Sequence, residues 1–159
     1  MDKKSLTVEE ILQKIVNYCV YQERCHHEVQ QKMATYDLIP EAQDYIISFL
    51  LEHNFLNEER FAKSYVRSKF NQKKWGKNKI RLELKRRQIQ EKLIAKSLQE
   101  IEDELYIKTL QELFEKKYSE LRSEKNHWKK KQKIYQYLTA KGYESDLIIN
   151  VLNAHFSEK

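Results

Sequence analysis

The chain has 159 residues and a formal net charge of +6, with 30 Lys and Arg, 24 Asp and Glu, two glycines and one proline. So few turn-forming residues exclude a protein built from β-hairpins, and no apolar run approaches the roughly 20 residues that a membrane-spanning helix needs. The composition therefore predicts a chain that is mainly or wholly α-helical.

Apolar spacing and helix-end signals predict nine helices in three groups of three. Thr7–Glu10 is a capping sequence that opens the first helix, and Pro40 suits the first turn of the third. Asn57 is a good N-cap for the fourth helix, which carries an aromatic stripe that includes Phe61 and Tyr65. The predicted helices cover about residues 7–21, 26–35, 40–53, 57–73, 77–87, 90–101, 102–118, 124–140 and 144–156.

An internal repeat relates the three groups. Apolar residues recur with successive spacings of 4, 5, 4 and 5 in three sets: Val29, Met33, Leu38, Ala42 and Ile47; Ile80, Leu84, Ile89, Leu93 and Leu98; Ile134, Leu138, Tyr143, Leu147 and Leu152. Just before the third position lie the expected helix caps Asp37, Gln88 and Gly142, of which glycine suits a left-handed cap best. We predict an elongated all-α array of three tandem three-helix repeats, at residues 1–55, 56–101 and 102–159.

Positive charge is concentrated in two segments. Residues 67–92 carry eleven Lys and Arg against two Glu, and residues 125–143 carry six lysines and no acid. Because the net charge is only +6, the remainder of the chain is net negative. This asymmetry predicts a polyanionic partner, or a partner with an acidic surface.

The predicted helix 77–87 presents Lys77, Arg81 and Lys85 as a stripe, because residues four apart share a helix face. Lys131 and Lys133 take the positions of Lys77 and Lys79 in the third repeat, whereas the first repeat has His26 and Glu28 there, so its corresponding face is not basic. We therefore predict that repeats two and three make the electrostatic contact, although the same lysines could form only a solvated helix face. The predicted contact residues are Arg67, Lys73, Lys74, Lys77, Arg81, Lys85, Arg86, Arg87, Lys129, Lys130, Lys131 and Lys133.

Other residues that could form a site carry weaker signals. Trp75 and Trp128 could stack on bases, but we expect them to anchor repeat junctions. Cys19, Cys25, His26 and His27 lack a metal-binding spacing, so we expect no metal or other cofactor. No phosphate loop, nucleophile elbow or paired-carboxylate site is recognisable, which argues against an enzyme. Two cysteines and the absence of a signal-type apolar segment after Met1–Ser5 predict a reduced, cytoplasmic protein.

Three motifs carry a family resemblance: Phe55–Ala62, the break at Lys74–Lys77 leading into the next helix, and Lys141–Tyr143 before the last helix. With them, residues 10–156 resemble the RecX family of bacterial regulators of the RecA recombinase. The resemblance implies a curved array of helical triplets that lies in the groove of a RecA–DNA filament. There it would inhibit ATP hydrolysis, strand exchange and stimulated repressor cleavage, and so modulate homologous recombination, DNA repair and the SOS response.

The partners expected from this reading are the RecA filament and single- or double-stranded DNA, bound by a monomer with no membrane partner. A second hypothesis stays open. Three-helix units with a basic second helix would also suit a protein that binds DNA without sequence specificity. Salt separates the two, since pure phosphate binding weakens by orders of magnitude between about 50 and 200 mM.

Overall fold

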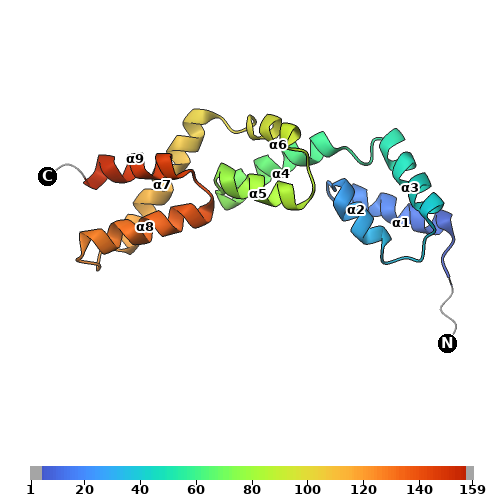
Figure 1. The fold of residues 1–159 in the computed structure, drawn as a ribbon, viewed down its shortest axis with the longest axis horizontal. Coiled ribbons are helices and arrows are strands. Elements are labelled where there is room, and N and C mark those ends of the chain that lie inside the picture. The colour runs from blue at the N-terminus through green and yellow to red at the C-terminus, as the bar shows by residue number, and fades with distance from the viewer. Residues whose placement is uncertain (1–4, 157–159) are drawn as a thin grey trace.

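The protein is an elongated, curved array of three tandem helical triplets (Figure 1). The computed structural model describes residues 5–156, and within that range every regular element is a helix. The helices are α1 (Val8–Tyr21), α2 (His26–Met33), α3 (Pro40–Glu52), α4 (Glu58–Lys73), α5 (Lys77–Arg86), α6 (Glu91–Leu98), α7 (Asp103–Glu120), α8 (His127–Lys141) and α9 (Ser145–Phe156). Repeat 1 denotes α1–α3, repeat 2 α4–α6 and repeat 3 α7–α9. Met1–Lys4, where the sequence predicts no leader, lie outside the described residues.

The helix ends form largely where local chemistry predicts them. The side-chain oxygens of Thr7 and Asn57 accept the amides of Glu10 and Arg60 at 3.1 and 3.0 Å, which confirms both caps. Helix α8 begins three residues later than predicted, because the Asn126 side chain caps it by accepting two backbone amides. Helix α6 is shorter than predicted and ends at Leu98.

Two of the three predicted caps adopt the left-handed conformation. Gly142 has a φ of 102° and Gln88 a φ of 61°, so glutamine takes this conformation despite being a poor choice for it. Asp37 does not, and the prediction for it was wrong. Helix α2 ends a turn earlier, at a right-handed Ala34, and the Tyr36 amide donates back to the Met33 carbonyl.

The predicted repeat register holds for the middle helix of each triplet. Its first two positions are buried in all three repeats: Val29 and Met33, Ile80 and Leu84, Ile134 and Leu138. In the third helices it is wrong by one residue at a single position of each: Ile94 and Ile148 are fully buried while Leu93 and Leu147 are only partly so, and in repeat 1 Ile46 is buried in place of Ile47. The last positions of repeats 2 and 3, Leu98 and Leu152, are buried as predicted. Neighbouring apolar residues on a helix differ by about 100° in direction, so spacing alone does not choose between them.

Within the described residues, the buried side chains form two hydrophobic cores. The first fills repeat 1 and includes Ile15, Val29 and Leu56. The second is shared by repeats 2 and 3 and also takes in Cys25, the residue that precedes α2. Repeats 2 and 3 are therefore packed as one continuous body, and repeat 1 has a core of its own.

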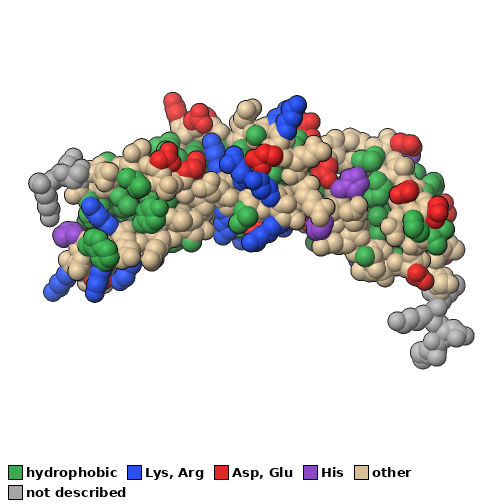
Figure 2. All heavy atoms as spheres, in the orientation of Figure 1, with side chains coloured by type: hydrophobic (Ala, Val, Ile, Leu, Met, Phe, Trp, Pro, Cys, Tyr) green, Lys and Arg blue, Asp and Glu red, His purple; other side chains and the backbone are tan. Residues whose placement is uncertain are grey.

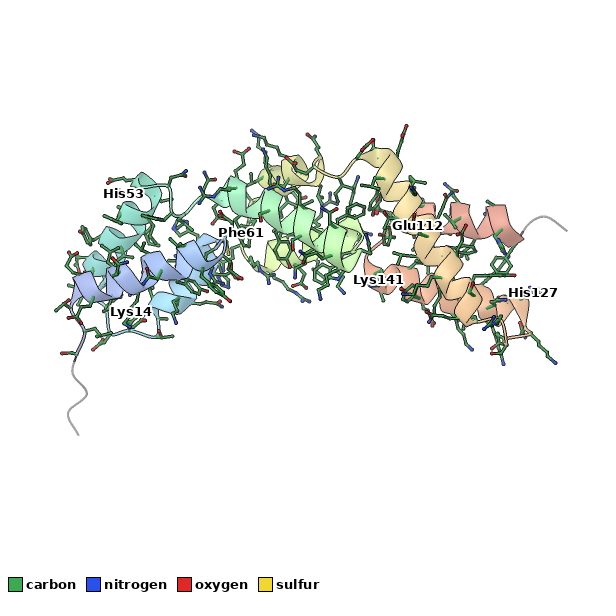
Figure 3. The ribbon with its side chains drawn as sticks, turned by 180° about the vertical axis from the view of Figure 1, so that it is seen from behind. Lys14, His53, Phe61, Glu112, His127 and Lys141 are labelled. Carbon is green, nitrogen blue, oxygen red and sulfur yellow. The ribbon has the colours of Figure 1, made fainter. Side chains whose placement is uncertain are left out.

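The only two glycines of the sequence meet where repeat 2 joins repeat 3. A Cβ on Gly76 would overlap the backbone carbonyl of Gly142, and a Cβ on Gly142 would lie 2.7 Å from the Lys79 amide nitrogen. The close approach lets the Gly76 amide donate to the Lys141 carbonyl at 2.7 Å, and the Asn78 amide donate to Gly142 at 2.9 Å. Lys141 marks this junction in Figure 3.

Candidate partner-binding surface

The predicted stripe on α5 lies beside carboxylates that the fold brings to it. Glu91, at the start of α6, lies 3.4 Å from Arg81 Nε and 3.1 Å from Lys85 Nζ. Lys77 Nζ lies 3.9 Å from Asp103 and 4.7 Å from the centre of the Tyr106 ring. The stripe is therefore partly neutralised by its own neighbours. Part of it, Lys77 and Arg81, lines a groove of about 510 Å³ that runs towards the α6–α7 connection.

Three further predicted arginines are paired as well. Arg86 and Arg87 share the carboxylate of Glu83, at 2.7 and 3.3 Å. Arg67 pairs with Glu100, two residues beyond the end of α6, at 3.4 Å. The pairs on α5 can be predicted from the sequence, because their members are i, i+3 and i, i+4 neighbours on a helix. The pair between Arg67 and Glu100 joins residues far apart in the sequence and is seen only in the folded structure.

The lysines of α8 fall into different environments. Lys129 is exposed, and Lys131 lies 5.2 Å from the centre of the Phe156 ring. Lys133 bonds to Glu124 at 2.8 Å, and this hydrogen bond lowers the pKa of the Glu124 carboxyl. Lys130 requires a correction to the predicted contact set. Only 6% of it is exposed and its Nζ lies 3.9 Å from the centre of the Tyr118 ring, so it stabilises repeat 3 and is not free for a partner.

Lys73, Lys74 and Lys129 are the predicted contact residues that remain exposed, with neither an ion pair nor an aromatic ring against them, within residues 5–156. Lys73 and Lys74 end α4 beside the glycine junction, and Lys129 lies in the first turn of α8. A partner can bind these three without displacing an internal carboxylate. Figure 2 shows Lys and Arg side chains over the middle of the arc and at the end formed by repeat 3.

The two tryptophans have different environments. Trp75 is half-buried against the shared core, with Lys69 and Lys79 amines 5.0 and 4.4 Å from its ring centre, as expected of an anchor. Trp128 is 68% exposed, so the expectation that it anchors a junction was wrong. Its ring is available to a partner next to Lys129.

Two stretches of the chain match known domains. Residues 57–98 match the second three-helix domain of RecX, and residues 103–152 match the third. The regulatory protein RecX of Yersinia enterocolitica is 30% identical over 117 residues, which cover 74% of this chain and 68% of that protein. The chain belongs to the RecX family. The family assignment made from the sequence motifs is thereby confirmed.

Other family members set the extent of the likeness. The regulatory protein RecX of Clostridium perfringens is 32% identical over 120 residues, which cover 75% of this chain and 56% of that protein. The chain spans about half the length of several such relatives. The crystal structure of RecX from Lactobacillus salivarius matches with a TM-score of 0.81 at 27% identity, over 92% of this chain and 95% of that one. The shared fold thus extends over most of the array.

The structure gives little evidence for a metal site, a reactive thiol or a membrane-spanning helix in the described residues. In the described part of the chain no group of three His, Cys, Asp or Glu is arranged to hold a metal ion. Cys19 and Cys25 are both buried free thiols, and burial raises their pKa values to about 11 and 12. Between Ser5 and Phe156, no helix combines the length and the apolarity that a membrane crossing requires.

Proposed function

We propose that this RecX family member binds along the RecA–DNA filament and inhibits the recombinase: its ATP hydrolysis, its strand exchange and its stimulation of repressor cleavage. It acts in the cytoplasm, by binding as a single copy and not as an enzyme, and so modulates DNA repair and the SOS response. The observation that carries the proposal is that this fold presents free lysines on a continuous two-repeat body. An arc of this kind suits an extended groove better than a compact pocket.

The free and the paired cations have different roles in this proposal. Lys73, Lys74 and Lys129 provide the long-range attraction, because they reach a phosphate or a carboxylate without losing an existing partner. Arg81 and Lys85 bind only where the partner replaces Glu91, so their contribution depends on the geometry of that partner. Specificity for the filament therefore comes from the α5 stripe, and the rate of encounter from the free lysines.

The experiment is a titration of the protein into DNA-dependent ATP hydrolysis by the cognate recombinase at physiological salt. Wild type should inhibit at well below one protein per recombinase subunit. A variant with Lys73, Lys74 and Lys129 changed to Gln should need about tenfold more protein, because it loses the steering charges. The matched control changes Lys92, Lys108 and Lys116 to Gln, three exposed unpaired lysines outside the predicted surface, and should behave as wild type.

Two outcomes would refute parts of the proposal. If hydrolysis is unaffected until the protein coats the DNA, the protein is a DNA-binding protein that ignores sequence, the second hypothesis above. If both triple variants inhibit equally well, the filament is bound through another surface. If the three lysines contact phosphates, replacing them would also reduce the slope of log binding constant against log salt concentration by roughly 2–3 units. That change would show how many of the three lysines bind DNA.

A further inference from the structure

All the basic residues between positions 5 and 55 line one groove. That segment contains three Lys and Arg and eight Asp and Glu, so its sequence suggests an acidic unit. Lys14 on α1, Arg24 in the α1–α2 connection and Lys32 on α2 nevertheless converge on a groove of about 360 Å³, and no acid lines it. Lys14 is labelled on α1 in Figure 3. The cations of repeat 1 thus gather in a groove whose lining residues include no carboxylate.

Three of the four tyrosines in the same segment line the same groove. Tyr18 and Tyr21 come from α1, and Tyr36 from the α2–α3 connection. Tyr21 is 82% exposed, the largest exposed fraction among the exposed large hydrophobic side chains of residues 5–156. We call this site the tyrosine groove: Lys14, Tyr18, Tyr21, Arg24, Lys32 and Tyr36.

The guanidinium of Arg24 lies over one of these rings. Its Cζ lies 3.7 Å from the centre of the Tyr18 ring, and its Nε–H donates to the Tyr18 carbonyl at 3.0 Å. Lys32 Nζ lies 5.7 Å from the same ring centre. Neither cation forms an ion pair with a described acid, and nor does Lys14. The exposed Tyr21 ring and the partly exposed Arg24 guanidinium thus offer two stacking groups beside cations that form no ion pair.

We propose that the tyrosine groove binds single-stranded nucleic acid, with bases stacked on Tyr21 and Arg24 and phosphates contacted by Lys14 and Lys32. Aromatic rings interleaved with unpaired cations are the combination that single-stranded nucleic acid needs, because its bases are free to stack and its backbone is anionic. Duplex DNA offers the same phosphates but keeps its bases stacked on each other. An acidic peptide would satisfy the cations and leave the exposed rings unused.

This inference goes beyond the proposed function, which assigns the electrostatic contact to repeats 2 and 3. Binding of single-stranded nucleic acid is tested on the free protein, with no recombinase present. Either proposal can therefore fail while the other holds.

The test is binding of an oligothymidylate of about 15 nucleotides by the full chain, with Tyr21→Ala compared with Tyr45→Ala. Tyr45 is a 47% exposed tyrosine on α3 outside the groove. Tyr21→Ala should weaken binding about 5- to 150-fold, the range for loss of one stacked base, and Tyr45→Ala should not. Lys32→Gln should lower the salt slope by about one unit. Circular dichroism confirms that each variant stays folded.

A second measurement locates the strand directly. An oligothymidylate carrying 5-iododeoxyuridine, cross-linked by light, should label the peptides that contain Tyr18, Tyr21 or Tyr36. Cross-links confined to repeats 2 and 3, or equal affinity of the two tyrosine variants, would overturn the proposal. So would equal binding of a duplex of the same length, or full competition by a polyglutamate peptide of matched charge.

Discussion

Between repeats 2 and 3 two backbones touch at Gly76 and Gly142, whereas between repeats 1 and 2 charged side chains pair beside the buried Cys25. Arg60 Nε bonds to Glu23 at 2.7 Å, and the His26 amide donates to Glu58 at 2.9 Å. About a third of each side chain in the Arg60–Glu23 pair is exposed. Phe61, labelled in Figure 3, lies at the end of repeat 2 that faces repeat 1.

The difference teaches how one array can combine a fixed and an adjustable part. Backbone contacts without intervening side chains allow little sliding, and a shared core stabilises them further. Exposed ion pairs are screened by salt and worth only about 0–1 kcal/mol each. We therefore expect repeats 2 and 3 to present their lysines as one rigid surface, while repeat 1 and its tyrosine groove adjust to the partner.

The largest expected effect comes from filling the glycine contact. Gly142→Ala forces a methyl group towards the Lys79 backbone and a side chain into a φ of 102°, so it should lower the free energy of unfolding by about 3 kcal/mol or more. Gly76→Ala should cost about 1–3 kcal/mol through overpacking alone. Urea unfolding measures both, with the exposed Ala140→Ser as control. Native stability of Gly76→Ala would mean that the two backbones do not touch.

A polar bridge at the same junction should give the next largest effect. The Tyr106 hydroxyl, on a side chain only 2% exposed, donates to the Glu144 carboxylate and accepts the Lys77 amide at 2.9 Å. Burial, followed by the hydrogen bond to Glu144, raises the pKa of Tyr106 far above its usual range. Tyr106→Phe leaves both partners unsatisfied and should cost about 1–3 kcal/mol in urea unfolding. The exposed Tyr45→Phe should cost nothing, and equal stability of the two variants would contradict the bridge.

The first junction should respond more weakly, and Cys25 reports on it. Glu23→Gln removes the ion pair with Arg60 and should cost at most about 1 kcal/mol, so labelling of Cys25 by iodoacetamide should accelerate up to about fivefold. Glu100→Gln removes the partner of Arg67 within repeat 2 and should leave that rate unchanged. Peptide mass spectrometry separates Cys25 from Cys19. Equal rates in both variants would show that the first junction does not open separately.

The same thiol gives a pH dependence with a definite sign. Burial raises the pKa of Cys25 to about 12, while an unfolded thiol ionises at about 8.5. The folded state therefore binds the proton more tightly. The stability that this difference contributes is complete below about pH 8.5 and declines as the pH rises towards 12. Cys25→Ala should flatten the loss of stability in urea unfolding between pH 8.5 and 10, and an unchanged slope would contradict the assignment.

The smallest effect is expected at a cap that lacks a glycine. Gln88 takes the left-handed conformation that Gly142 takes in repeat 3, and it does so at a steric cost. Gln88→Gly should raise the free energy of unfolding by about 0.5 kcal/mol, after the entropy cost of glycine is subtracted. Gln99→Gly, at a right-handed cap with a φ of −67°, should instead lower it by about 0.5–1 kcal/mol.

Local patterns were enough to predict the nine helices of residues 5–156 and the caps at Thr7 and Asn57, because periodicity and side-chain capping act between residues a few positions apart. The grouping in threes came instead from the repeat of one apolar pattern along the chain. The buried position in α6 and α9 was missed by one residue, because Leu93 and Ile94 are both apolar and only packing chooses between them.

The site depended on contacts between distant segments. A charge count along the chain found the basic segments, but it did not show that Glu91 and Glu100 pair with Arg81, Lys85 and Arg67. It also found the rest of the chain net negative, and did not show that three cations of repeat 1 meet three tyrosines in one groove. Ion pairs and grooves are set by distances in space, and such distances exist only once the helices have packed. The two glycines stand out in the sequence because glycine is so rare in it. Only the tertiary structure brings them into contact, since they lie 66 residues apart in the chain.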